Sequence, residues 1–301
     1  MKKFIHFLTI SLLLSTPYTI QAKMSVFACE PEWASLAEEI GGEKITAFSA
    51  TSARQDPHHI RARPSLIAKV RRADVLICSG AGLEVGWLPI LLQKGSAKVQ
   101  PGSLGFLMAA EQVPLLEKPV VIDRSLGDIH PEGNPHVHLN PHHILLIAKN
   151  LTNRLVKIDN INETFYRQRF QNFSKRWRQS IKEWETQASI LKNQTVVVHH
   201  RSFSYLIDWL GLKQAASLEP KPGIPPTTSH LESLLQQFKS RPAMLIMRSP
   251  SDSDEASQWL ADKTTMPAII LPYTVGGDEQ SSDLFKLFDR TIRLLRDAYE
   301  H

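Results

Sequence analysis

The strongest constraint on the fold of this 301-residue chain is a segment without glycine or proline, from about residue 162 to residue 191. As one helix with a rise of 1.5 Å per residue it would be about 45 Å long, which exceeds the usual length of a helix in a globular protein. Such a helix is typical of a strut between two lobes. The chain is also long enough for two domains of about 100–150 residues each.

Short apolar runs alternate with helical stretches on both sides of this segment. The runs before it are MSVFAC, KITAFSA, DVLICSG and KPVVIDR, and those after it include QTVVVHH, AMLIMRS and AIILPYT. Because this alternation is typical of a parallel sheet with helices on both faces, we predict an α/β fold with two such lobes. The predicted segments are a signal peptide at 1–22, an N-terminal lobe at 23–160, a linking helix at 161–192 and a C-terminal lobe at 193–301.

The N-terminus has the pattern of an export signal. Lys2 and Lys3 precede the apolar run FIHFLTISLLL, and Ala22 is a small residue at the expected cleavage point. The run is too short to span a bilayer, which needs about 20 helical residues, although a retained anchor is the alternative. Cys29 lies too far along to be a lipidated cysteine directly after the run. We therefore predict a periplasmic protein that is secreted with a cleaved signal peptide and is not lipid-anchored.

The charge of the chain is mildly basic. Without residues 1–22 it has 33 basic and 30 acidic residues, a net charge of +3 with neutral histidines. Nucleic-acid-binding proteins concentrate basic residues into dense stripes, whereas the short basic stretches here are interpreted as solvated helix faces. The sequence therefore predicts no nucleic-acid partner. Cys29 and Cys78 each end an apolar run, and a disulfide or two buried thiols on neighbouring strands fit this pattern equally well.

Most of the twelve histidines fall into three clusters near the ends of predicted strands. Open parallel sheets bind their ligands in the crevice beyond the carboxyl ends of the strands. A cleft between the two lobes would therefore bring these distant clusters together. The clusters are His58 and His59; His130, His136, His138, His142 and His143; and His199 and His200.

Neutral imidazole is a good zinc ligand, and three histidines with one carboxylate would complete a tetrahedral site. A site assembled across two lobes would also hold the lobes closed. Some histidines have other interpretations. His142 and His143 fit an exposed first helical turn, and His59 and His138 are interpreted as auxiliary groups around the site. His130 lies in a loop that is expected to pass the metal ion inward.

The chain resembles the periplasmic metal-binding proteins of zinc and manganese ABC importers, known as ZnuA-like or cluster A-I solute-binding proteins. Three motifs carry this resemblance across nearly all of the mature chain: DPHHIRARPSLIAKVRRADVLICSGAGLE, GNPHVHLNP and VVVHHRSFSYLIDWLGL. The ligand positions of the family in these motifs fall on His58, His136 and His200. The segment LEPKPGIPPTTSHLESL is also similar to a loop of the family.

The resemblance implies two lobes joined by one rigid helix. It also implies high-affinity capture of a divalent metal ion and delivery to a membrane permease driven by an ATPase, and we expect a monomer. The fourth ligand of the family is usually an acidic residue directly after the last strand of the second lobe. Here Tyr273 stands near that place, and Asp278 is our candidate because the two glycines before it would let the loop fold back. His59, Glu279 or a water molecule are the alternatives.

The softness of the ligands indicates which metal ion binds. Manganese-binding relatives replace a histidine with a second carboxylate, so His200 favours Zn²⁺ over Mn²⁺. Copper(II) and nickel(II) also bind imidazole strongly. A metal-dependent adhesin or a periplasmic metallochaperone of the same fold is the alternative function. A zinc hydrolase is less favoured, because Asn140 stands where the H-x-H-x-D pattern needs an aspartate. We therefore predict a binding protein and not an enzyme.

Overall fold

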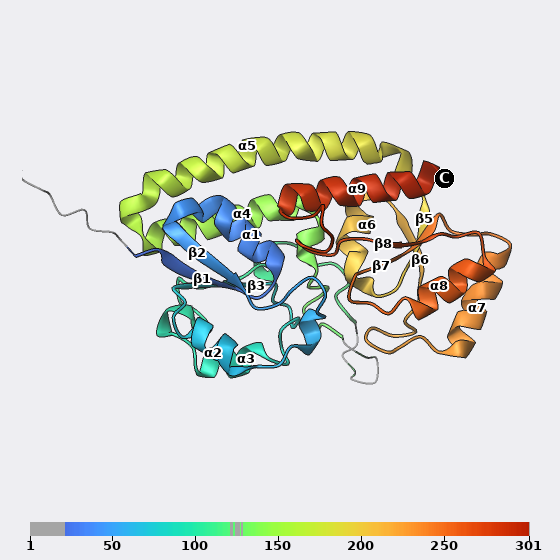
Figure 1. Ribbon diagram of the computed structural model, residues 1–301, viewed down its shortest axis with the longest axis horizontal. Helices are drawn as coiled ribbons and strands as arrows, with labels where there is room; N and C mark the ends of the chain where they lie inside the picture. Colours follow the sequence, from blue (N-terminus) through green and yellow to red (C-terminus); the bar gives the residue numbers. More distant parts are fainter. Residues whose placement is uncertain (1–21, 121–122, 124–126, 128, 301) are drawn as a thin grey trace, which may run out of the picture.

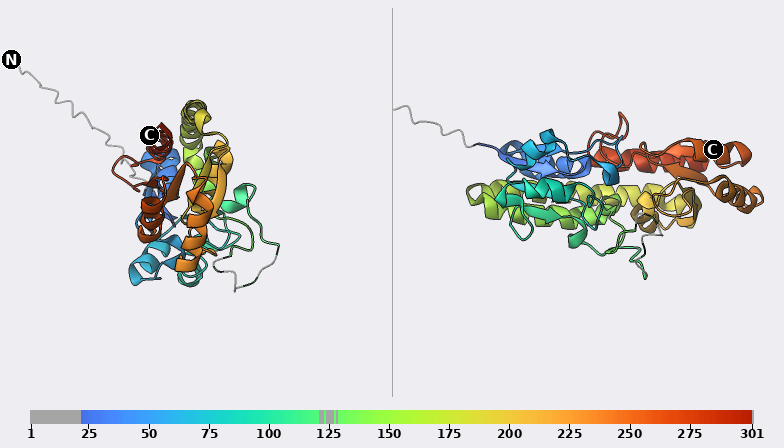
Figure 2. Two further views of the ribbon diagram at one scale, coloured as in Figure 1. Left: turned by 90° about the vertical axis from the view of Figure 1, so that its right-hand side faces the viewer. Right: turned by 90° about the horizontal axis from the view of Figure 1, so that it is seen from below.

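The computed structural model describes residues 22–120, 123, 127 and 129–300, so nearly all of the expected signal segment lies outside the described residues. Two α/β lobes lie end to end, and one long helix runs along both of them (Figures 1 and 2). The predicted fold class, two parallel sheets flanked by helices, is confirmed. Within the described part of the chain, no helix combines the length and the apolar character that a membrane crossing requires.

The sheet of the first lobe has four parallel strands in the order β2-β1-β3-β4. These strands are β1 (Met24–Ala28), β2 (Ile45–Ser49), β3 (Val75–Cys78) and β4 (Phe106–Met108). The two central strands are apolar on both faces, because α1 covers one face and α2 and α3 cover the other. These helices are α1 (Pro31–Gly41), α2 (Pro64–Val70) and α3 (Leu88–Gln93).

The sheet of the second lobe repeats this arrangement in the order β6-β5-β7-β8. Its strands are β5 (Thr195–Val198), β6 (Lys213–Ser217), β7 (Leu245–Arg248) and β8 (Ala268–Ile270). Its helices are α6 (Ser204–Leu210), α7 (Thr228–Lys239), α8 (Glu255–Lys263) and α9 (Leu284–Glu300). In both sheets the chain leaves the first strand on one side and returns on the other. This reversal of strand order creates a crevice at the carboxyl ends of the strands.

One strand of the first sheet differs from the prediction. The fourth strand is β4, a three-residue strand that the sequence pattern does not predict. The run KPVVIDR, which was expected to form a strand, is irregular at 118–120, and most of its remaining residues lie outside the described part. A strand of three residues is too short for its apolar periodicity to stand out from a loop.

The expected long helix is α5 (Glu163–Ala188), which has 26 residues and is preceded by α4 (Pro141–Ile158). It buries one stripe of side chains at helical spacing. Two of these, Trp177 and Trp184, contact Phe285 and Phe288 of α9 with ring centroids 4.8 and 5.0 Å apart. The full stripe is Tyr166, Phe173, Trp177, Ile181, Trp184 and Ala188.

The two lobes share one hydrophobic core. Val26 and Val75 of the first sheet and Val196 and Leu245 of the second belong to a single contiguous cluster of buried residues, which the stripe of α5 completes. Protein interiors are as closely packed as organic crystals. Separating the lobes would therefore open a packed interior, and the crevices of the two sheets are held at a fixed distance.

A disulfide joins Cys29 and Cys78 at the carboxyl ends of β1 and β3. Both residues are fully buried, and the two strands are hydrogen-bonded neighbours in the sheet. Of the two interpretations that the sequence allows for the cysteines, the structure therefore has the disulfide.

Replacement of both cysteines by alanine should lower the free energy of unfolding by about 2–4 kcal/mol, because the bond restricts the unfolded chain. The bonded residues lie 49 positions apart in the sequence. Urea-induced unfolding of the metal-free protein, followed by circular dichroism, measures the change. The reduced wild-type protein is the matched control, since it keeps both sulfur atoms without the bond. Equal stability of the oxidised and reduced wild-type protein would contradict the prediction.

Candidate metal site

Three loops at the inner edges of the two lobes bring histidines together. His58 lies in a short turn after β2, His136 lies just before α4, and His200 follows β5. Their ligand nitrogens lie within 4.8 Å of one another. The cavity that they line has a volume of about 50 Å³. This is room for a single ion and far too little for an organic ligand.

Carboxylates hold two of these rings from the side away from the cavity. Nδ1 of His58 donates to Oδ1 of Asp56 at 2.7 Å, and Nδ1 of His200 donates to Oε2 of Glu219 at 2.7 Å. A carboxylate oxygen accepts hydrogen bonds, so we assign the ring hydrogen to Nδ1 in both residues. Nε2 is then left with a free lone pair, as in metal-binding histidines whose other nitrogen is held by a carboxylate.

Hydrogen bonding between the histidines and the carboxylates shifts the pKa values of Asp56 and His200. Burial alone would raise the pKa of Asp56, but hydrogen bonds and the charge of His58 lower that pKa to about 2. Burial alone would lower the pKa of His200, but the hydrogen bond and charge of Glu219 outweigh it and raise that pKa above 6.5. Glu219 therefore makes the His200 ring a stronger electron donor toward a cation.

His136 is the most deeply buried of the three. Its Nδ1 is hydrogen-bonded to the hydroxyl of Tyr273 at 2.6 Å, and its backbone N–H donates to Asn134 at 3.0 Å. Among the described residues, its Nε2 has no hydrogen-bond partner. Burial, together with the neighbouring histidines, lowers the pKa of His136 well below 6.5. Because an unsatisfied buried polar atom is costly, this nitrogen is well suited to bind an ion.

A fourth histidine, His130, stands beside these three. Its Nε2 lies 3.2 Å from Nε2 of His58, and its Nδ1 donates to the carbonyl of Ala81 at 3.1 Å. Burial and the charges of the neighbouring histidines lower the pKa of His130 to about 4. The ring is therefore neutral at pH 7, which is the state that a metal ligand requires. From the sequence, His130 is expected only to lie in a loop that passes the metal ion inward.

The structure does not bring Asp278 to the histidines. Its carboxylate accepts a hydrogen bond from Nε of Arg290 at 2.6 Å, and Asp278 is not among the residues that line the cavity. Burial would raise the pKa of Asp278, but the hydrogen bond from Arg290 lowers it. Glu279 lines a separate cavity beside α9. His59 has an exposed side chain that faces Asp56.

Tyr273 stands near the place where the resemblance implies an acidic ligand, and it contacts the first lobe at two points. Its hydroxyl is bonded to His136, and its backbone carbonyl accepts a hydrogen bond from Nε2 of His138 at 2.9 Å. The hydroxyl of Thr274 donates to Glu32, and Glu32 lies 3.3 Å from Nδ1 of His138. We call these contacts of Tyr273 and Thr274 with the first lobe the interlobe clasp.

A wider cavity adjoins the histidines and reaches exposed residues. It has a volume of about 540 Å³ and is lined by His130, His136 and His200. Lys118 and Val120, whose side chains are exposed, line it as well. It offers a hydrated ion a path to the histidines without separation of the lobes.

A second group of potential ligand atoms lies in the first lobe. Atoms of Cys29, Cys78 and Glu84 lie within 4.8 Å of one another. The two sulfur atoms are bonded to each other, so neither is available as the thiolate that a metal ion needs. In the described part of the chain, this leaves the histidine cluster as the candidate metal site.

Comparison with known proteins identifies the family of this chain. The profile of the family described as "Zinc-uptake complex component A periplasmic" matches residues 26–298. The metal ABC transporter substrate-binding lipoprotein SloC of Streptococcus mutans is 23% identical over 275 residues, which cover 89% of this chain and 87% of that protein. The manganese ABC transporter substrate-binding lipoprotein PsaA of Streptococcus anginosus is 21% identical over 250 residues, covering 81% and 78% of the two chains.

A solved structure shares the fold. The crystal structure of ZnuA matches with a TM-score of 0.78 at 19% identity, and the match covers 92% of this chain and 100% of that chain. The family profile spans all three histidine loops, and the solved fold has the same two-lobed architecture. The chain therefore belongs to the ZnuA family of metal-binding proteins of ABC transporters, and it is a substrate-binding component of transport and not an enzyme.

Proposed function

We propose that this protein captures Zn²⁺ in the periplasm and delivers it to the permease of an ABC importer. The family binds divalent metal ions, and we propose both the ion that this chain binds and the atoms that bind it. The observation that supports it most is the convergence of four histidine rings, of which three line the small cavity and the fourth, His130, lies beside His58. In each ring a partner on the far side engages Nδ1, so four Nε2 atoms are left for a cation.

The proposed ligands are Nε2 of His58, His130, His136 and His200. Zinc prefers four ligands in a tetrahedron with Zn–N distances of about 2.0–2.1 Å, which places neighbouring ligand atoms about 3.3 Å apart. The 3.2 Å between Nε2 of His58 and Nε2 of His130 already matches this spacing. We propose His130 as the fourth ligand in place of Asp278, because the Asp278 carboxylate is bound to Arg290.

The ligand set favours zinc over manganese. All four proposed ligands are neutral nitrogens, whereas Mn²⁺ is a harder ion that prefers carboxylate oxygen and binds nitrogen ligands more weakly. Where the resemblance implies a carboxylate, this chain has Tyr273, whose hydroxyl is bonded to His136. Nothing in the proposed set therefore compensates Mn²⁺ for the lack of oxygen ligands.

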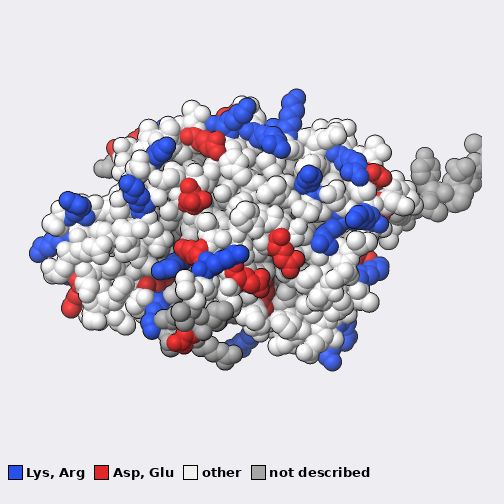
Figure 3. All heavy atoms as spheres, turned by 180° about the vertical axis from the view of Figure 1, so that it is seen from behind, with Lys and Arg blue, Asp and Glu red and all other residues white. Residues whose placement is uncertain are grey.

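The proposed location and partners follow from the export signal and the family. Cleavage after residue 22, without a lipid anchor, would release a periplasmic monomer that docks on the permease and is served by its ATPase. On the face shown in Figure 3, lysine and arginine side chains are interspersed with aspartate and glutamate. This mixed surface suits a protein that diffuses freely between its capture of the ion and its delivery.

His58→Ala, His136→Ala and His200→Ala should each weaken zinc binding by more than about 100-fold. Loss of a group that only supports a ligand costs about 10- to 100-fold, so loss of a ligand itself should cost more. His130→Ala should also weaken it clearly, since it removes the fourth nitrogen. Asp278→Ala is the matched control and should leave the affinity unchanged. Competition with a chromophoric chelator measures each dissociation constant. A loss of zinc affinity in Asp278→Ala as large as in His130→Ala would indicate that the fourth ligand is the Asp278 carboxylate.

Zinc affinity should decrease with falling pH, because protons compete with the ion for the ring nitrogens. Glu219 raises the pKa of His200 above 6.5, so His200 is protonated at higher pH than His130 and His136. His130 and His136 have lowered pKa values and stay neutral to lower pH. Glu219→Gln should therefore move the onset of the decrease to lower pH. Chelator competition between about pH 8 and pH 5 tests this, and identical profiles for both proteins would contradict it.

Tyr273→Asp should increase the affinity for Mn²⁺ relative to Zn²⁺, because it supplies an oxygen ligand at the place of the phenol. Tyr273→Phe is the control, since it removes the same hydroxyl without adding a carboxylate. Each protein is equilibrated with both ions, and the bound metal is measured by elemental mass spectrometry. An equal Mn²⁺ to Zn²⁺ ratio in the two variants would show that position 273 does not select the ion.

A further inference from the structure

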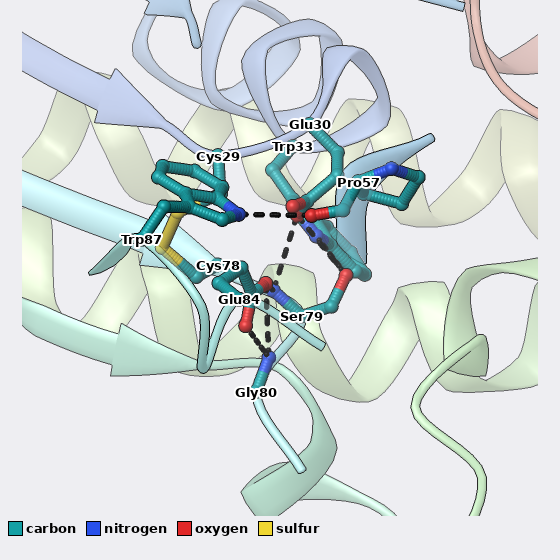
Figure 4. Close-up of a disulfide and its surroundings, with 9 residues drawn as sticks. All are labelled: Cys29, Glu30, Trp33, Pro57, Cys78, Ser79, Gly80, Glu84 and Trp87. Carbon is teal, nitrogen blue, oxygen red and sulfur yellow. Dashed lines mark hydrogen bonds between the residues drawn. A yellow bond between two sulfur atoms is a disulfide. The ribbon is translucent and has the colours of Figure 1, made fainter. Parts of the chain in front are cut away.

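The loop that follows β3, residues 79–87, supports the metal site from behind, and we call it the support loop. The carbonyl of Ala81 in this loop accepts the hydrogen bond from Nδ1 of His130. At the far end of the loop, the buried Trp87 donates from Nε1 to the carbonyl of Pro57 at 2.8 Å (Figure 4). Pro57 directly precedes His58, so the support loop contacts the segments of two proposed ligands.

The backbone of the support loop is strained where it meets His130. Gly80, Ala81 and Gly82 have φ angles of 78°, 49° and 82°. Glycine adopts such left-handed conformations readily, but alanine does so rarely. A residue in this region keeps its conformation only when its surroundings enforce it. The direction of the Ala81 carbonyl, and with it the hydrogen bond to His130, therefore depends on what holds the loop.

The side chain of Glu84 holds the start of the support loop. Its carboxylate accepts hydrogen bonds from the backbone N–H of Ser79 at 2.7 Å and of Gly80 at 3.1 Å (Figure 4). Ser79 also donates from its hydroxyl to Glu30 at 3.1 Å. Successive N–H groups that converge on one anionic group form a nest in the backbone. Here the loop fills this nest with its own side chain.

The carboxyl pair of Glu84 and Glu30 is buried and tightly fixed. The two residues are 3% and 1% exposed, and both accept hydrogen bonds from Ser79. Burial raises the pKa of Glu84 to about 7, and burial with the charge of Glu84 raises that of Glu30 well above 4.5. Glu30 follows Cys29 and Ser79 follows Cys78, so the disulfide fixes the spacing of the strand ends on which the pair rests. Neither carboxyl lines the metal cavity.

We propose that Glu84 is a positioning residue for the metal site, an inference that rests on the proposed role of His130 as a ligand. By accepting two backbone N–H groups, Glu84 keeps the support loop in the form that directs the Ala81 carbonyl at His130. That hydrogen bond fixes the ring and leaves Nε2 free for the ion. Glutamine at position 84 keeps an accepting oxygen and gains an amide that can donate to Glu30. Alanine at position 84 removes the acceptor.

A double-mutant cycle on zinc affinity tests this role. Glu84→Ala should weaken zinc binding about 10-fold, as is typical for loss of an outer support, and Glu84→Gln should restore most of the affinity. In the His130→Ala background the effect of Glu84→Ala should vanish, because its target is gone. In the His200→Ala background, where the ligand belongs to the other lobe, it should persist. Equal losses in both backgrounds would overturn the proposal, because they would indicate a general loss of structure.

Glu84→Asp provides a second route if Glu84→Ala does not fold. It keeps a carboxylate but shortens the side chain by one methylene, so the same dependence on His130 is expected. Thermal unfolding of each zinc-free variant reports on the fold separately from binding. If His200→Ala bound zinc as tightly as the wild-type protein, the proposed function itself would fail. A normal loss in His200→Ala with no coupling between positions 84 and 130 would refute only the role of Glu84.

Discussion

The packing of α5 against both lobes is the constraint on which the rest of the structure depends. Trp177 and Trp184 of α5 contact the aromatic residues of α9, and the buried residues of both sheets belong to the same core. The two sheets have equivalent strand orders, and this packing holds the carboxyl ends of their strands close to one site. Loops that are far apart in the sequence can then build a single site, because the scaffold has removed the freedom of one lobe relative to the other.

Within this scaffold, the site is organised by contacts of atoms that would not touch the ion. Asp56, Glu219, Tyr273 and the carbonyl of Ala81 each engage one ring at Nδ1. A ring fixed in this way loses little conformational freedom when it binds a metal ion, so more of the binding energy appears as affinity. His136 has a buried Nε2 with no partner among the described residues. A cation there would relieve this unsatisfied atom, which couples metal binding to the stability of the fold.

Much of the fold was predictable from the sequence, because its signals are local. The lack of glycine and proline in α5, and the alternation of strands and helices, depend only on neighbouring residues. The clustering of His58, His136 and His200 was predictable because strand ends meet at one edge and because the motifs have family spacing. The three-residue β4 offered no periodicity to detect. The sequence did not decide whether Cys29 and Cys78 form a disulfide, because the pairing of β1 with β3 is a long-range contact that no local pattern reveals.

The surroundings of Asp278 and His130 were the hardest part of the candidate site to predict, for the same reason. Asp278 was chosen for its place in the chain and for the flexibility of the glycines before it, but Arg290 on α9 lies within reach and binds its carboxylate. His130 had no distinctive spacing. Its ring is held by Ala81, which is 49 positions away in the sequence, through a backbone conformation that local propensity disfavours.

The interlobe clasp has a consequence for how the cargo leaves. Tyr273 holds the first lobe through both its hydroxyl and its carbonyl, and Thr274 adds a contact to the buried Glu32. Prising the lobes apart would break these bonds between buried groups, which is costly. Thermal motion alone would rarely open such a joint, so loading and unloading should not require the lobes to separate. The ion would instead pass through the wider cavity that adjoins the histidines, so the clasped lobes act as a rigid frame beside an opening and not as a trap that closes over its cargo.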